Sequence, residues 1–193
     1  MGTATVRDIT SVVRLAKSGN REALSMLIEQ TQNKFHRFLC GLTGNKALAD
    51  DLCQESYIKT LENLDKLKDD SKFLSWLYRT GKNIFLDHLK SKHNKTEPVT
   101  DDATVELDRS SILSMEDVID INKALQLLGI EERMVLITVD MEGYSYSEAA
   151  ELLELSEDSI RMRLFRARQK FVSNFETTEP LKSSIKWEKK NEL

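Results

Sequence analysis

The stretch YSYSEAAELLELSEDSIRMRLFRARQKF, from Tyr144 to Phe171, has the pattern of two helices joined by a tight turn. The first helix carries small and apolar residues, and the turn falls at residues 154–156. Ser156 is placed to cap the second helix by accepting a hydrogen bond from a backbone N–H group. The second helix repeats apolar residues on one face, at Ile160, Leu164, Ala167 and Phe171. The stretch therefore predicts a helix-turn-helix.

The opposite face of the second helix is polar, basic and aromatic. It carries Met162, Phe165, Arg166 and Gln169, with Ser159 and Arg161 at its sides. Residues 161–170 hold five Lys or Arg and no acid. Such a helix fits the DNA major groove, where arginine pairs with guanine and a phenylalanine contacts the thymine methyl group. The alternative is a surface helix whose arginines are only solvated.

A second basic face is predicted in FLSWLYRTGKNIFLDHLK, residues 73–90. At about 100° per residue, one half of this helix is apolar: Phe73, Leu74, Leu77, Tyr78, Ile84, Phe85 and Leu89. The other half carries Trp76, Arg79, Asn83 and Lys90, with Leu86 among them. Tryptophan stacks on unpaired bases, cations meet phosphate, and an amide reads a base edge. The alternative is a tryptophan that covers a neighbouring loop beside solvated cations.

The charge is distributed in blocks although the net charge is only −4. Residues 72–95 hold six Lys or Arg and one Asp, whereas residues 96–120 hold eight acids and one Arg. Local basic patches, and not the total charge, attract phosphate.

The chain divides into two predicted domains. Residues 93–114 lose helical periodicity and carry Pro98 and most of the acidic excess, which predicts a flexible acidic linker between domains at 1–92 and 115–175, with a tail at 176–193. Seven glycines and two prolines favour helix throughout. We expect an all-α protein with helices near 8–17, 20–42, 46–65, 72–92, 115–128, 131–141, 146–154 and 157–175.

These motifs, together with LTGNKALADDLCQESYIKT (Leu42–Thr60), resemble the bacterial RNA polymerase sigma factors of the extracytoplasmic-function (ECF) type in the sigma-70 family. The resemblance covers roughly residues 20–95 and 115–172. It implies that the first domain is the helical bundle called region 2 and the second is the helix-turn-helix domain called region 4. The implied partners are core RNA polymerase, promoter DNA and an anti-sigma factor.

The resemblance also implies residue roles. The surface that binds the clamp helices of the largest polymerase subunit matches Asp50, Asp51, Gln54 and Glu55, and the helical wheel places Ile58 on the same face as an exposed apolar anchor. Trp76, Arg79, Asn83 and Lys90 match the helix that opens the downstream promoter element and captures a flipped base, with the loop 65–72 as part of the pocket. Ser159, Arg161, Met162, Arg163, Phe165 and Arg166 match the helix that reads the upstream element. Apolar residues of the second domain would dock on the flap of the second-largest subunit.

The chain departs from the family pattern at three places. Leu128-Gly129-Ile130 stands where a Leu-Pro pair is common, which leaves the start of that helix open. Met162 stands where a small residue usually precedes the arginine, which bears on the promoter sequence read. Gly81 follows Thr80 in place of the usual Ile-Ala, and it costs about 1 kcal/mol of helix stability relative to alanine.

The sequence shows no catalytic constellation, cofactor motif or second metal-ligand pair to complete His36 and Cys40, so we expect a non-enzymatic protein without cofactor or metal. Cys53 falls on an apolar stripe, which favours a buried reduced thiol. The N-terminus lacks an apolar signal segment and no window is long enough to cross a bilayer, which predicts a cytoplasmic protein without membrane insertion. The alternative functions are a helix-turn-helix repressor or response-regulator-like protein acting without polymerase, and a polymerase regulator that reads no promoter. We also expect weak DNA binding by the free protein, with the linker acids shielding the basic faces or the domains closing on each other.

Overall fold

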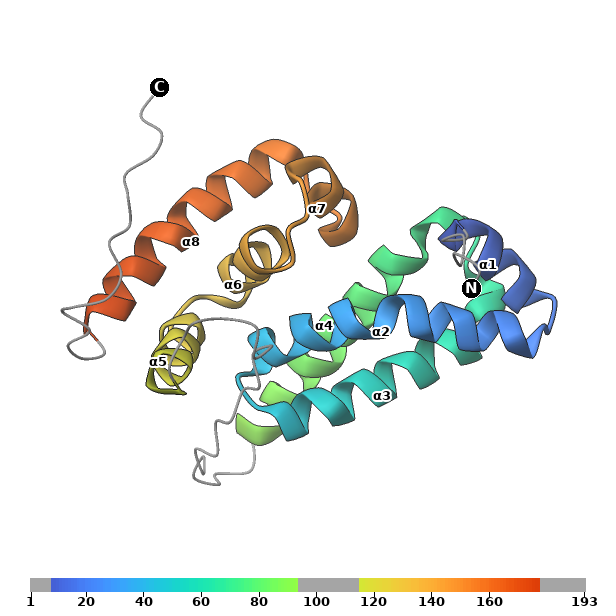
Figure 1. The fold of residues 1–193 in the computed structure, drawn as a ribbon, viewed down its shortest axis with the longest axis horizontal. Helices are drawn as coiled ribbons and strands as arrows, with labels where there is room; N and C mark the ends of the chain where they lie inside the picture. Colours follow the sequence, from blue (N-terminus) through green and yellow to red (C-terminus); the bar gives the residue numbers. More distant parts are fainter. Residues whose placement is uncertain (1–7, 94–114, 178–193) are drawn as a thin grey trace, which may run out of the picture.

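The computed structural model describes residues 8–93 and 115–177, where all regular structure is helical (Figure 1). The all-α prediction is therefore confirmed, while the predicted linker and tail lie almost wholly outside the described residues. The elements are α1 (Ile9–Lys17), α2 (Arg21–Thr43), α3 (Lys46–Glu62), the 3₁₀ turns η1 (Leu64–Lys66) and η2 (Asp70–Lys72), α4 (Phe73–His93), α5 (Met115–Gln126), α6 (Ile130–Leu136), the π-helical turn η3 (Ile137–Met141), α7 (Tyr146–Leu153) and α8 (Glu157–Thr177).

The helices α1 to α4 form an N-terminal bundle in which α2 packs against α1, α3 and α4. Aromatic rings fill its centre. Phe35 meets Tyr57 edge-on at a centroid distance of 5.7 Å, and Phe38 lies 4.7 Å from Tyr78. These rings bury a large apolar area in geometries that aromatic pairs prefer, so they hold α2, α3 and α4 together.

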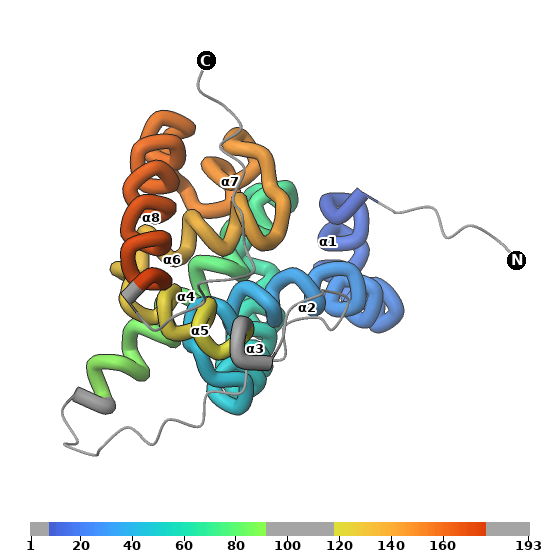
Figure 2. Tube along the Cα trace, turned by 60° about the vertical axis from the view of Figure 1, so that its left-hand side comes forward, coloured from blue at the N-terminus to red at the C-terminus, as the bar shows by residue number. Residues whose placement is uncertain are grey.

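The apolar half predicted for α4 faces this bundle, with one exception. Phe73, Leu77, Tyr78, Ile84 and Phe85 are buried and Leu74 is half-buried, but Leu89 is 38% exposed. Figure 2 shows the reason, because the last turns of α4 project beyond the neighbouring helices. The prediction for Leu89 was therefore wrong: the periodicity continues past the point where a partner helix exists.

Gly81 is a packing residue and not merely a weak point in α4. A Cβ atom at this position would lie 2.7 Å from Phe35 Cζ and 3.3 Å from Leu39 Cδ2. The missing side chain therefore allows α4 to approach α2 closely. Glycine lowers the intrinsic stability of α4, and the closer packing of α4 on α2 offsets this loss.

The helices α5 to α8 form a C-terminal domain with its own core. Ile160, Leu164 and Ala167, three residues of the predicted α8 stripe, are buried, and Phe171 packs against the same cluster. Gly129 precedes α6, so this helix starts at Ile130 without the family's proline.

The helix-turn-helix is formed by α7 and α8. Ser145 and Glu148 make a reciprocal capping box at the start of α7. The Ser159 N–H donates to Ser156 Oγ at 3.2 Å, as predicted for the cap of α8. Glu154 ends α7 in the left-handed conformation, with φ 56° and ψ 45°, a conformation that costs a non-glycine residue roughly 1–2 kcal/mol.

The two domains pack against each other through apolar side chains. Met134, Ile137 and Leu152 of the C-terminal domain belong to the same buried cluster as the core of the N-terminal bundle. Gly41 on α2 faces Ile137, whose Cδ1 would lie 2.9 Å from a Cβ atom at residue 41. Contacts of α4 with α7 and of α2 with α5 and α6 accompany this shared core (Figure 2).

Buried polar contacts fix the same junction. Asn122 Nδ2 donates to the Gly44 carbonyl at 3.1 Å, Gln126 Nε2 to the Gly41 carbonyl at 3.1 Å, and Arg133 Nη1 to the Leu42 carbonyl at 2.6 Å. The last carbonyls of a helix lack partners within it, so three side chains from α5 and α6 complete the end of α2.

Burial also shapes the chemistry of three groups. It lowers the pKa of Arg133 to about 10, still far above neutral, so the guanidinium remains charged inside the junction. Burial raises the pKa of Cys40 and Cys53 to about 11, which keeps both thiols protonated. Cys53 is half-buried, so the prediction that it is buried was wrong, although its raised pKa fits the predicted unreactive thiol.

Gly81→Ala tests the packing account. We expect a net loss of about 1–2 kcal/mol in the free energy of unfolding, because overpacking against Phe35 outweighs the gain in helix propensity. Urea denaturation of the full chain measures it. A gain of about 1 kcal/mol, as helix propensity alone predicts, would contradict the close approach of α2 and α4.

Candidate nucleic-acid interface

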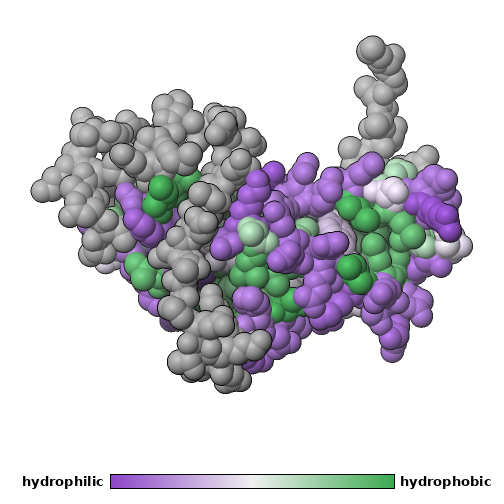
Figure 3. All heavy atoms as spheres, turned by 90° about the horizontal axis from the view of Figure 1, so that it is seen from below, coloured by the Kyte–Doolittle hydropathy of each residue, from purple (hydrophilic) through white to green (hydrophobic). Residues whose placement is uncertain are grey.

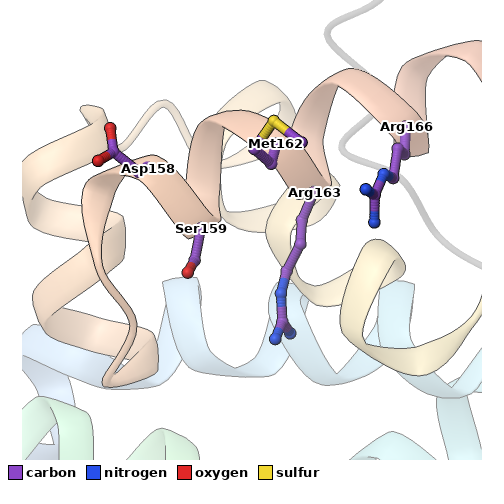
Figure 4. Close-up of a pocket in the computed structure, with 5 residues that line it drawn as sticks. All are labelled: Asp158, Ser159, Met162, Arg163 and Arg166. Atoms are coloured by element: carbon purple, nitrogen blue, oxygen red, sulfur yellow. The ribbon is translucent and has the colours of Figure 1, made fainter.

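The outer face of α8 presents Arg161, Met162, Phe165 and Arg166 to solvent, whereas the predicted Ser159 and Arg163 are half-buried. Met162 is 55% exposed and Phe165 is 61% exposed. Ser159, Arg163 and Arg166 project from the same side of the helix (Figure 4), where with Asp158 and Met162 they line a shallow pocket. This row follows the i, i+4, i+7 spacing, so the three side chains can contact successive groups along one groove.

The arginines of α8 differ in their partners. Arg163 Nη1 lies 2.6 Å from Glu131 Oε2. Arg161 lies 3.7 Å from Glu157 and rests 5.9 Å from the centre of the Tyr146 ring. Arg166 is exposed and makes no ion pair with any residue in the described part of the chain. Arg166 is therefore the cation of this row that is best placed to read a base.

The outer face of α4 is only partly as predicted. Arg79, Asn83 and Lys90 are exposed, whereas Trp76 is half-buried and packs against the bundle core. The indole is wide enough to touch the core with one part and leave the other accessible, so the placement of Trp76 wholly off the packing face was wrong. Arg79 Nη1 lies 3.1 Å from both carboxylate oxygens of Glu154, and Lys90 pairs with Asp87 at 3.1 Å.

The loop at residues 65–72 is held by α1. Lys17 Nζ donates to the Leu67 carbonyl and lies 2.5 Å from Asp70 Oδ1. Hydrogen bonds from the Ser71 side chain and backbone N–H order η2 and lower the pKa of Asp69. Sequence reasoning missed Lys17, because a contact across about fifty residues leaves no local signal.

The predicted partner-binding face of α3 is exposed, and the opposite face is buried. Asp50, Asp51, Gln54 and Glu55 are exposed, and Ile58 is 49% exposed. His36 Nε2 lies 2.6 Å from Asp50, and Lys59 pairs with Glu55 at 2.7 Å. Figure 3, which views the molecule from below, shows a mostly hydrophilic surface with apolar patches between the polar residues. An apolar side chain ringed by polar groups is typical of a protein-binding anchor.

Glu131 connects the two basic helices and was not predicted from the sequence. Its carboxylate lies 2.5 Å from Lys82 on α4 and 2.6 Å from Arg163 on α8. Although partial burial acts to raise it, hydrogen bonds from these two cations lower the pKa of Glu131. The residue therefore stays ionised between them.

Comparison with known proteins places this geometry in a family. Residues 27–95 match the model for Sigma-70 region 2, and residues 119–171 match the model for Sigma-70 region 4. The ECF RNA polymerase sigma factor SigM of Mycobacterium tuberculosis strain H37Rv is 30% identical over 156 residues, which cover 80% of this chain and 78% of SigM. The chain belongs to the ECF sigma factors of the sigma-70 family. The SigM factor of Bacillus subtilis is 29% identical over 148 residues, covering 75% of this chain and 90% of that factor.

Two solved structures share the fold of this sigma factor. CnrH, in a complex with the cytosolic domain of CnrY, has a TM-score of 0.66 at 21% identity and covers 89% of this chain and 99% of its own. RpoE from Bartonella quintana, crystallised with the anti-sigma factor NepR, has a TM-score of 0.62 at 20% identity and covers 90% of this chain and 100% of its own. The match to region 2 covers the N-terminal bundle from within α2 to the end of α4, and the match to region 4 runs from within α5 to within α8.

Within residues 8–93 and 115–177, no helix has both the length and the apolar character that crossing a membrane requires.

Lys17→Met tests whether α1 holds the loop at 65–72. The change keeps the aliphatic stem and removes the ammonium group, so we expect faster amide hydrogen exchange in the loop and a loss of about 1 kcal/mol in stability. Arg14→Met is the matched control, because Arg14 is mostly exposed and lies 3.6 Å from Asp70. If amide hydrogen exchange in the loop were equally fast in both variants, Lys17 would not be the residue that holds the loop.

Proposed function

We propose that this ECF sigma factor reads the upstream promoter element as duplex DNA with α8 and opens the downstream element with α4. As a sigma factor, the chain binds core RNA polymerase and directs promoter-specific transcription initiation. The observation that carries the residue assignment is the presence of two distinct basic faces in one chain, one on a helix-turn-helix and one beside Trp76.

The upstream assignment rests on the form and exposure of α8. The helix follows a capped turn, its apolar stripe is buried, and Phe165 and Arg166 point to solvent. A helix held in this way can enter the major groove with its outer face towards the base edges. Arg166 would pair with guanine and Phe165 would contact a thymine methyl group. Ser159, Arg161, Met162 and Arg163 complete the proposed contact surface.

The downstream assignment rests on α4. Arg79, Asn83 and Lys90 offer two cations and one amide on an exposed face, and the partly exposed Trp76 stands at its edge. Base stacking on an aromatic ring contributes about 1–3 kcal/mol per base, which is comparable to the cost of unstacking one. Trp76 would stack on the unpaired strand while the cations meet its phosphates.

The face of α3 that carries Asp50, Asp51, Gln54, Glu55 and Ile58 is the proposed contact with the clamp helices of the largest polymerase subunit. Ile58 would bury its exposed half there, and the polar groups around it would set the orientation. Apolar residues of region 4 would meet the flap of the second-largest subunit. An anti-sigma factor, implied by the family resemblance, stays a prediction for this chain.

The sigma factor would contribute sequence selection and leave the chemistry to the polymerase. It would therefore act in the cytoplasm and need no cofactor or metal of its own. A repressor that acts without polymerase is the alternative function, but such a protein requires neither the Ile58 face nor an aromatic base-stacking edge. The surfaces on α3 and α4 favour the sigma-factor assignment.

Transcript mapping tests the function directly. The purified protein is added to bacterial core RNA polymerase on fragmented genomic DNA, and transcript starts are mapped. We expect starts that share two spaced upstream motifs. DNA binding without any new starts would instead support the repressor.

Arg166→Ala tests the base-reading role. We expect a loss of about 1–3 kcal/mol in promoter binding by the holoenzyme and relaxed specificity at one upstream position. Arg168→Ala is the matched control, because Arg168 lies on the same helix but pairs with Asp140 at 2.6 Å and 2.9 Å. If the affinity fell equally on all promoter sequences, Arg166 would contact a phosphate and not a base.

Trp76→Ala tests the opening role. We expect open-complex formation, followed by permanganate reactivity of unpaired thymines, to fall much more than closed-complex affinity. Trp76→Phe keeps an aromatic ring and should recover most of the opening. Equal losses of both steps in Trp76→Ala would indicate a packing role, in keeping with the half-buried position of the indole.

A further inference from the structure

Asp158 is an acidic residue on the outer face of α8, among residues that the proposed function assigns to duplex DNA. It lines the same shallow pocket as Met162 and Arg166 (Figure 4). At about 100° per residue, Asp158 and Met162 lie about 40° apart, directly opposite the buried stripe of this helix. When α8 enters a major groove, Asp158 therefore faces the base edges more directly than the half-buried Arg163 does.

The Asp158 carboxylate is only weakly engaged by the protein itself. Its side chain is 93% exposed, and its ion pair with Arg161 spans 4.0 Å. From α6 to the turn of the helix-turn-helix, every acid instead pairs with a cation or caps a helix, as Glu132 pairs with Lys170 at 2.7 Å. The oxygens of Asp158 thus remain available to accept hydrogen bonds from a ligand.

The start of α8 does not depend on Asp158 for its own stability. A carboxylate in the first turn interacts favourably with the helix dipole, which is the alternative explanation for an acid at this position. Ser156 already caps this end, and Glu157 supplies a second carboxylate in the same turn. Neither role explains why Asp158 stands in the DNA-facing pocket.

The major groove accepts a carboxylate at few positions. Phosphates on both sides of the groove repel it. On the base edges, guanine and thymine present acceptor oxygens, and adenine presents the acceptor N7 beside its amino group, whereas cytosine presents only its N4 amino donor. A carboxylate that enters the groove is therefore best placed against a cytosine.

We propose that Asp158 reads a cytosine in the upstream promoter element by accepting a hydrogen bond from the N4 amino group. This inference rests on the proposed function of α8, because it adds a specificity-determining residue to the same face. The apolar side chain of Met162, one turn away, excludes water from the contact and so strengthens it. Arg166 lies eight residues along the helix, about 12 Å away, so the cytosine lies about three base pairs from the guanine that Arg166 reads.

The test uses holoenzyme formed with the full-length protein and a pool of duplex promoters whose upstream element is randomised. Bound DNA is recovered and sequenced, which gives the base preference at each position. The variants are Asp158→Ala and Asp158→Asn. Glu157→Gln is the matched control, because it removes the same charge from the same helical turn but lies outside the pocket.

We expect the unsubstituted holoenzyme to prefer cytosine about tenfold at one upstream position. Asp158→Ala should lose this preference, and Asp158→Asn should move it to adenine, because an amide pairs with both N6 and N7 of adenine. Glu157→Gln should keep it. If both Asp158 variants kept the original preferences and only bound all sequences more tightly, as expected for a lost repulsion, the inference would be wrong. Since Asp158 is exposed, its replacement leaves the fold intact.

Arg166→Ala in the same pool separates this inference from the proposed function. If Arg166→Ala lost a guanine preference while the Asp158 variants changed none, the role of Asp158 alone would be overturned. If the unsubstituted holoenzyme selected no upstream motif, the duplex-reading role of α8 would be overturned and the role of Asp158 with it.

Discussion

The end of α2 depends on side chains from the other half of the chain. Arg133 is the central one: it donates to the Leu42 carbonyl on one side and to the Gln126 and Leu128 carbonyls on the other. A buried guanidinium without these acceptors would cost several kcal/mol of desolvation. This contact helps to fix region 4 against region 2, together with the other capped carbonyls and the shared apolar core. The hydrogen bond from Ser75 on α4 to the Glu151 carbonyl on α7 adds a further contact between the two regions.

The position of region 4 decides which charges are available for DNA. With α7 seated on α4, carboxylates of region 4 face Arg79 and Lys82, and Glu131 also holds Arg163. Arg166 and Phe165, on the outer side of α8, remain open to solvent. In this arrangement Arg166 and Phe165 of the proposed duplex-reading face are accessible, whereas Arg79 of the proposed strand-opening face is held by Glu154. The exposed α3 face carrying Ile58 stays available to a protein partner in the same arrangement.

The sequence alone predicted each helix closely, because periodicity, caps and turn residues are local signals. The α8 stripe and the Ser156 cap are the clearest cases. The contacts between domains had no such signal: Arg37 and Glu142 are separated by 105 residues, and Arg79 and Glu154 by 75. A helical wheel predicts the direction in which a side chain points, but not where a neighbouring helix ends or how closely it packs. The environments of Trp76, Leu89 and Gly81 were therefore not predicted correctly. The proposed promoter and polymerase roles of the exposed residues rest on the family resemblance together with the exposed faces of α3, α4 and α8.

Energy transfer between the regions tests the central claim that the free sigma factor is one closed body. A donor and an acceptor would be placed at Gln30 on α2 and Gln169 on α8, two exposed positions outside the junction. We predict one population with high transfer in the free protein and a fall in transfer when core RNA polymerase is added. Low, broadly distributed transfer in the free protein that does not change with polymerase would contradict the account.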